Sequence, residues 1–175
     1  DEALLHYQRI QQGTFVNTKA LNVSKALLKK YNLEQALTYI DKEIKIKNQN
    51  NLLNSLSLKL SIFEEIGESA DIINLSTQIL QNFPNNERAL YSRALAYEKE
   101  GNILSMSKDF DEMIKLNQYN SIALNAYGYS LALHKLHLDK SEKLVRKALD
   151  IRPGQAAILD SLAWVLYLKG SYKEA

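Results

Sequence analysis

The sequence predicts an all-α solenoid in which antiparallel helix pairs stack one after another. Three glycines keep an almost regular spacing: Gly67 and Gly101 are 34 residues apart, and Gly101 and Gly170 are 69 apart, which is twice 34 plus one. Pro84 and Pro153 are also 69 residues apart. No segment shows the two-residue alternation of a half-buried strand. A period near 34 residues is typical of helix–turn–helix repeats, which bury their apolar faces by stacking on one another.

Aligning these glycines divides the chain into repeats. The predicted repeats are 17–52, 53–86, 87–120 and 121–155, with a half repeat at 1–16 and a truncated repeat at 156–175. Both ends of the chain fall inside helical patterns. We therefore expect residues 1–175 to be a single solenoid fragment of a longer repeat protein, because each repeat of a solenoid packs only on its neighbours.

Each repeat is predicted to hold two amphipathic helices joined by a tight turn. In the repeat 87–120 the first helix covers 87–100, and Gly101 suits the left-handed position that ends a helix. The second helix covers 103–116. The apolar face of the first helix recurs at helical spacing at Leu90, Ala94 and Tyr97. Asn-rich segments with the chemistry of turns are found at 48–51, 84–86 and 117–120.

Prolines and small residues stand where stacked helix pairs require them. Pro84 and Pro153 lie just past the second helices of their repeats, where a proline stops a helix without breaking one. Ala94 and Gly128 lie inside first helices, where a small side chain lets two helix backbones approach closely.

Composition excludes several function classes. The net charge is +2 and the chain has no long basic run, so we expect no nucleic-acid partner and interpret Lys25, Lys29 and Lys30 as a solvated helix face. With no cysteine the chain can form neither a disulfide nor a thiolate metal site. No stretch approaches 18 apolar residues, so we expect no membrane contact within this fragment.

Set in register, these residues resemble tetratricopeptide repeats over essentially the whole chain. The best match is 159–175, which carries the family pattern at Leu159, Leu162, Ala163, Leu166, Gly170, Tyr172 and Ala175. Two departures stand out, since Arg93 occupies a position that is usually Leu and Lys135 replaces the turn glycine. The resemblance implies a superhelix whose first helices line a concave groove that binds a protein or peptide partner.

A narrower resemblance concerns three segments in their order along the chain. Residues 2–13, 125–132 and 159–164 resemble the C-terminal half of bacterial envelope tetratricopeptide lipoproteins. A member of that group serves as an adaptor for a periplasmic carboxyl-terminal processing protease. The resemblance implies a periplasmic scaffold tethered to the outer membrane through a segment outside this chain. A cytoplasmic location is the alternative.

The repeat register predicts which side chains face the groove. Its N-terminal part is polar and charged, and its C-terminal part is aromatic. The predicted peptide-binding residues are Tyr91, Leu95, Asn125, Tyr129, Asp160, Trp164 and Tyr167. Aromatic rings give contact area at little entropic cost and are enriched at binding hot spots. The alternative is that the rings pack against a neighbouring repeat or against the rest of the longer chain.

The carboxylate clamp of co-chaperone tetratricopeptide domains is not expected. That clamp needs Lys, Asn and Arg side chains from successive first helices. This chain has Leu21, Ser57 and Tyr91 at the matching positions.

Catalytic, metal and cofactor sites are not expected either. His134 and His137 are three residues apart, but they flank a predicted turn and no third ligand is evident, which favours a solvated pair. The chain has no phosphate-binding glycine loop and no serine placed with a base. We therefore predict a non-enzymatic interaction scaffold. Two alternatives stay open: a self-association module, and a non-catalytic arm of a larger enzyme.

Overall fold

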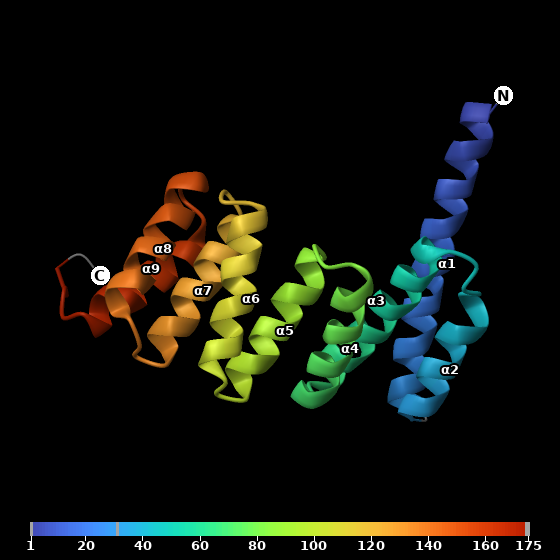
Figure 1. The fold of residues 1–175 in the computed structure, drawn as a ribbon, viewed down its shortest axis with the longest axis horizontal. Helices are drawn as coiled ribbons and strands as arrows, with labels where there is room; N and C mark the ends of the chain where they lie inside the picture. Colours follow the sequence, from blue (N-terminus) through green and yellow to red (C-terminus); the bar gives the residue numbers. More distant parts are fainter. Residues whose placement is uncertain (1, 31, 174–175) are drawn as a thin grey trace. The chain divides into compact units, whose positions relative to one another are not determined.

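The computed structural model describes residues 2–30 and 32–173, with side chains from residue 16 onward. In this part of the chain there are nine helices and no strand, which confirms the all-α class (Figure 1). The chain forms two compact units, Asp1–Asn86 and Glu87–Ala175. The border between them coincides with a predicted repeat boundary.

Unit 1 consists of two helix pairs. Its helices are α1 (Glu2–Lys30), α2 (Leu33–Glu43), α3 (Gln49–Ile66) and α4 (Ser69–Asn82). The core between them is built from Ala20, Ile40, Ile44, Leu58 and Ile62. They come from α1, α2 and α3, except that Ile44 is the residue directly after α2. Ile40 with Ile44 and Leu58 with Ile62 are four residues apart, the spacing of an inward apolar stripe.

Two boundaries in unit 1 differ from the expected repeats. Helix α1 continues through Asn17 without a break, and the side chains of the expected half repeat 1–16 lie, except for residue 16, outside the described residues. Helix α3 begins at Gln49, inside the segment assigned to the preceding repeat. It begins early because the side chain of Asn48 accepts a hydrogen bond from the backbone N–H of Asn51 at 2.9 Å, which caps the helix.

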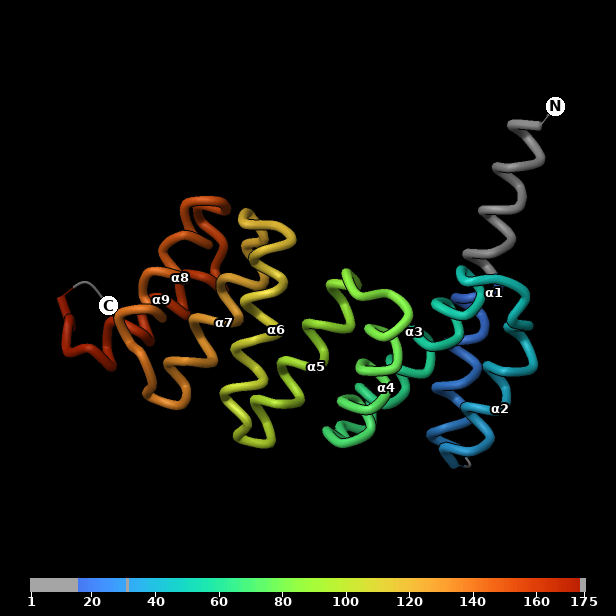
Figure 2. The backbone as a smooth tube through the Cα atoms, in the orientation of Figure 1, coloured from blue at the N-terminus to red at the C-terminus, as the bar shows by residue number. Residues whose placement is uncertain are grey.

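Unit 2 contains two helix pairs and a further helix. The helices are α5 (Glu87–Lys99), α6 (Ile103–Leu116), α7 (Ser121–Leu133), α8 (Leu138–Ile151) and α9 (Ala156–Leu168). The chain reverses direction at each connection within the unit (Figure 2). Helices α7, α8 and α9 enclose a core of Leu124, Ala132, Val145, Ala148, Ile158, Leu162, Val165 and Leu166.

The turns inside the helix pairs of unit 2 have the predicted chemistry. Gly101 ends α5 with a φ of 71°, and the N–H of Asn102 donates to the carbonyl of Tyr97 at 2.8 Å. Lys135 takes the same left-handed conformation after α7, with a φ of 53°, and the N–H of Leu136 donates to the carbonyl of Leu131 at 2.9 Å. The same hydrogen-bond pattern thus closes both turns, and Lys135 does replace the turn glycine.

Helices α7 and α8 approach closely at Gly128, as expected. The hydroxyl of Ser141 on α8 donates to the carbonyl of Gly128 at 2.6 Å. A Cβ atom at position 128 would lie 2.5 Å from Cγ2 of Val145 and 2.9 Å from the backbone oxygen of Ser141. The close contact fixes α7 on α8, and a different side of α7 faces the site described next.

Candidate functional site

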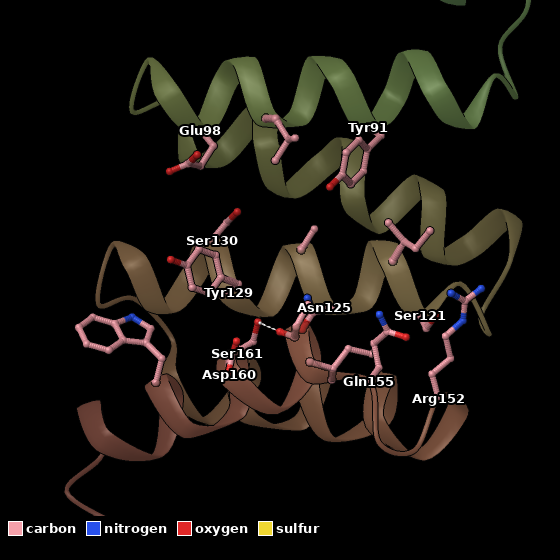
Figure 3. Close-up of a pocket in the computed structure, with 16 residues that line it drawn as sticks. Tyr91, Glu98, Ser121, Asn125, Tyr129, Ser130, Arg152, Gln155, Asp160 and Ser161 are labelled. Carbon is pink, nitrogen blue, oxygen red and sulfur yellow. Dashed lines mark hydrogen bonds between the residues drawn. The ribbon is translucent and has the colours of Figure 1, made fainter. Parts of the chain in front are cut away.

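One side of unit 2 is hollowed by a cavity of about 700 Å³, called the groove below (Figure 3). Helices α5, α7 and α9 line it, together with Arg152 and Gln155 from the connection between α8 and α9. These three helices are the first helices of their predicted repeats. The second helices α6 and α8 pack behind them.

The groove brings together six of the seven predicted binding residues. Tyr91 and Leu95 come from α5, Asn125 and Tyr129 from α7, and Asp160 and Trp164 from α9. The seventh, Tyr167, lies outside the groove lining and stacks on Trp164, with ring centroids 5.7 Å apart. Whether these residues bind a peptide stays a prediction.

Three of the aromatic rings are available for contact. Tyr129 is 42% exposed, Trp164 39% and Tyr167 54%. Tyr91 differs, because it is half-buried and its ring meets Phe110 of α6 edge-on at 6.2 Å. Burial raises the pKa of the Tyr91 hydroxyl above its ordinary value. Tyr91 therefore combines a packing role with its place in the groove wall, and the other three rings offer open surface.

Asn125 presents an unsatisfied polar atom on the groove side of α7. Its Oδ1 atom is buried and has no hydrogen-bond partner among the described residues. Leaving a buried acceptor without a donor costs about 1–3 kcal/mol. The neighbouring hydroxyl of Ser161 does not satisfy it, because that hydroxyl donates to the carbonyl of Ala157 at 2.8 Å (Figure 3). Because this atom has almost no accessible surface, a molecule bound in the groove does not reach it unless the side chain rotates.

Charged side chains are distributed unevenly along the groove. Figure 3 shows Arg152, Gln155 and Ser121 at one end, and Glu98 and Tyr129 toward the other. Glu98 is already engaged, since its Oε1 lies 2.8 Å from Nε2 of His134. Arg152 and Asp160 make no ion pair with any described residue and are exposed.

The histidine pair differs from the solvated pair expected. His134 is half-buried and contacts Glu98 of α5, and His137 alone is exposed, in a left-handed conformation at the start of α8. The difference arises because the turn after α7 folds His134 back toward α5. Within residues 16–30 and 32–173, no group of three or more His, Asp or Glu side chains could hold a metal ion. Over the described residues, no helix is both long and apolar enough to cross a bilayer.

Lys25 and Lys29, two of the three lysines interpreted above as a solvated helix face, have their charge partly neutralised by Glu65. Nζ of Lys25 lies 2.7 Å from Glu65 and Nζ of Lys29 lies 3.8 Å from it. The hydrogen bond from Lys25, with the charge of both lysines, holds the pKa of Glu65 below its ordinary value. This arrangement agrees with the interpretation as a solvated helix face.

The end of the groove formed by Arg152 and Gln155 was not predicted from the repeat pattern. The repeat register assigns groove positions only to first helices, and these two residues lie in a connection. Arg152 is the residue after α8, and its backbone N–H donates to the carbonyl of Ala148 at 3.0 Å. The sequence gives one indication of this end of the groove, namely that Arg152 directly precedes the turn residues Pro153 and Gly154.

Antiparallel helix pairs with a 34-residue period and a groove lined by first helices define the tetratricopeptide-repeat type of solenoid. No family model matches the chain. The tetratricopeptide repeat-containing protein PA4667 of Pseudomonas aeruginosa is 34% identical over 96 residues. The matched segment covers 55% of this chain and 16% of that protein, so the chain corresponds to a small part of that relative.

Solved structures show the same fold. A tetratricopeptide repeat protein from Parabacteroides merdae superposes with a TM-score of 0.73 at 18% identity, covering 91% of this chain and 62% of its own. The first tetratricopeptide domain of Spaghetti (RPAP3), bound to the HSP90 peptide SRMEEVD, gives a TM-score of 0.62 at 18% identity, covering 67% of this chain and 93% of its own. The fold is thus that of a tetratricopeptide solenoid.

Proposed function

We propose that this chain is a non-enzymatic scaffold whose groove in unit 2 binds a segment of a partner protein. The observation that carries the proposal is the groove itself: Tyr129 and Trp164 expose their rings around a cavity that Asn125 also lines. Exposed rings supply apolar contact area for a bound segment. The peptide complex of the structurally similar Spaghetti domain supports a ligand of this kind.

The second part of the proposal concerns the cellular location of the scaffold and its partner. We infer an adaptor in a bacterial envelope, tethered to the outer membrane and delivering substrates to a carboxyl-terminal processing protease. The three segments that resemble envelope lipoproteins support it, as does a bacterial tetratricopeptide relative at 34% identity. Cell fractionation tests the location: recovery of the native protein with the outer membrane is expected, and recovery in the cytosol would overturn this part alone.

An affinity capture from the native source tests the binding function. The bait is the wild-type chain beside a Tyr129→Ala/Trp164→Ala variant of equal helicity. The matched control is Leu104→Ala/Tyr119→Ala, which removes two exposed apolar side chains of unit 2 that do not line the groove. We expect wild type and control to capture a protein that the groove variant does not, with a processing protease among the prey. Identical prey on all three baits would move binding away from the groove.

A second candidate function, self-association, is favoured by a row of exposed rings. Tyr167 lies 5.7 Å from Trp164 on one side and 5.7 Å from Tyr172 on the other, and Tyr172 is 70% exposed. Such a row suits contact with a second copy of the chain. Light scattering at several concentrations tests it: a mass that rises with concentration and falls in a Tyr167→Ala/Tyr172→Ala variant supports self-association, and a constant monomer mass excludes it.

A further inference from the structure

We propose that one edge of unit 2 docks on an anionic lipid surface. This edge, called the turn edge below, consists of the segments in which the chain leaves a first helix: 99–104, 133–139 and 168–173. The inference goes beyond the proposed function, because it concerns a second surface outside the groove. Two features carry it: apolar side chains exposed at the turns, and an excess of lysine around them.

The three segments lie at the same side of unit 2, the lower side in Figure 1. Helices α5, α7 and α9 run in the same direction, so all three end there. Two contacts join the segments to one another. His134, after α7, contacts Glu98 near the end of α5 at 2.8 Å, and Lys169, after α9, pairs with Asp139 at the start of α8. The turn between α7 and α8 is therefore in contact with both of its neighbours.

Apolar side chains project from each part of the turn edge. Leu104 is 69% exposed, Leu133 47% and Leu136 39%, and Tyr172 is exposed as well. None of the four lines the groove. A protein interface requires a core packed as densely as a protein interior, whereas a lipid headgroup layer adapts around separate apolar side chains. Single leucines on successive turns, with a tyrosine beside them, therefore favour a lipid surface.

The turn between α7 and α8 exposes Leu136 in an unusual backbone conformation. The residues on either side of it, Lys135 and His137, have φ angles of 53° and 47°. Residues with a side chain seldom adopt this left-handed conformation, and in the other two turns Gly101 and Gly170 adopt it instead. This turn is also one residue longer than the turn between α5 and α6. Strained residues of this kind gather at functional sites, which supports a binding role for the turn.

The turn edge is electropositive. Its three segments contain four lysines and two acidic residues, and their net charge of +2 equals that of the whole chain. Lys135 and Lys173 are exposed and form no ion pair with a described residue. One of the two acidic residues, Asp139, is engaged by Lys169. Lysines near a membrane are attracted by the negative surface potential of anionic lipids. The leucines would thus enter the headgroup layer while the lysines meet the lipid phosphates.

A contact of this kind differs from a spanning segment. The expectation of no membrane contact followed from the lack of a long apolar stretch, which is what spanning requires. A peripheral contact needs only a few apolar side chains at headgroup depth together with cationic ones. The turn edge meets this second requirement, and the expectation is revised accordingly.

Fluorescence from a dye attached at one site of the 175-residue chain tests the inference. The sequence has no cysteine, so a single introduced cysteine takes the label. Leu136→Cys places an environment-sensitive dye on the turn edge. The matched control is Tyr119→Cys, at an exposed residue between α6 and α7 that lies outside both the turn edge and the groove. Each protein is mixed with vesicles of equal parts phosphatidylglycerol and phosphatidylcholine, or of phosphatidylcholine alone.

We expect the emission of the dye at position 136 to shift to the blue with the anionic vesicles, and the emission at position 119 to stay unchanged. Co-sedimentation of the unlabelled chain with the same vesicles tests the role of charge. The affinity should fall about tenfold in Lys135→Glu and change little in Lys147→Glu, which alters an exposed residue of α8 outside the turn edge.

Three results would overturn the inference: no shift at position 136 with the anionic vesicles, equal shifts at positions 136 and 119, or equal shifts with anionic and neutral vesicles. The first would leave the turn edge to a protein partner. None of the substituted residues lines the groove, so each of these results leaves the proposed function standing.

Discussion

Arg93 on α5 and Asp109 on α6 form a two-pronged ion pair across one helix pair. Nε of Arg93 donates to Oδ2 of Asp109 at 2.9 Å, and Nη2 donates to Oδ1 at 2.7 Å. The side chains are 19% and 7% exposed. These hydrogen bonds raise the pKa of the Arg93 guanidinium above its ordinary value. The pair explains how an arginine occupies a position where tetratricopeptide repeats usually carry leucine.

Removing one partner of this ion pair should lower the free energy of unfolding more than replacing both partners by apolar residues. Asp109→Ala leaves a largely buried guanidinium without its carboxylate and should lower the free energy of unfolding by about 3 kcal/mol. The double change Arg93→Leu/Asp109→Leu restores an apolar contact and should be at least as stable as wild type. Urea denaturation of the three proteins measures this, and a double variant less stable than Asp109→Ala would contradict the account.

Gly128→Ala should destabilise the protein although it increases helix propensity. The added Cβ would meet Val145 and the backbone of Ser141 within 3 Å, so α7 and α8 must move apart. Overpacking of this kind costs about 1–3 kcal/mol, whereas relief of a helical glycine contributes up to about 1 kcal/mol in the other direction. Thermal unfolding, followed by circular dichroism, shows whether the net effect of the substitution is to lower or to raise stability. A higher Tm than wild type would show that the helices have room to adjust.

Trp164→Ala should weaken binding of the partner segment and leave the fold intact. The indole is 39% exposed and lines the groove, so its loss removes contact area rather than core. We expect the affinity for a groove-selected peptide to fall by about 2 kcal/mol or more, as measured by calorimetry. Tyr119→Ala, an exposed aromatic truncation outside the groove, serves as the control. An unchanged affinity together with a lowered Tm would assign Trp164 to packing.

Asn125→Leu should separate stability from binding. The change removes a buried oxygen that has no partner, so the unbound chain should become more stable by about 1 kcal/mol or more. The same change replaces the polar amide of a groove-lining residue by an apolar group and should weaken binding of the peptide. Calorimetry and thermal unfolding on one preparation measure both effects. A variant that loses stability would show that Asn125 has a structural partner in solution.

The ion pairs between α8 and Lys169 should make stability depend on pH. Hydrogen bonds from Lys169 and Arg146 hold the pKa of Glu142 below its ordinary value, and Nζ of Lys169 lies 2.7 Å from Oε2 of Glu142. A lowered folded-state pKa contributes stability above the unfolded value, and this contribution is lost as the pH falls through the folded value.

Lys169→Met tests this pH dependence. The variant should have a lower Tm than wild type at neutral pH. The difference should disappear in acid once Glu142 and Asp139, the two carboxylates that pair with Lys169, are both protonated. A difference of Tm that is the same at neutral and acidic pH would show that Lys169 acts through its aliphatic stem instead.

Much of the helical framework could be predicted because its determinants are local. A glycine or lysine that ends a helix, a proline that follows one and a stripe of apolar residues at helical spacing act over a few residues. The turns at Gly101 and Lys135 therefore appear where expected. The same periodicity places Tyr91, Asn125 and Tyr129 on one side of their helices, which is why the groove residues of α5, α7 and α9 were predictable.

Pairings between distant residues depended on the tertiary structure. The contact of Glu98 with His134 joins residues 36 apart, and the sequence carries no local sign of it. Arg152 enters the groove because of where α8 and α9 meet, and the packing of the helices leaves the Oδ1 atom of Asn125 buried without a partner. Helical periodicity is set by short-range contacts and can be read along the chain. The partner of each polar side chain is set by which helices approach one another, and that is decided only when the helices pack.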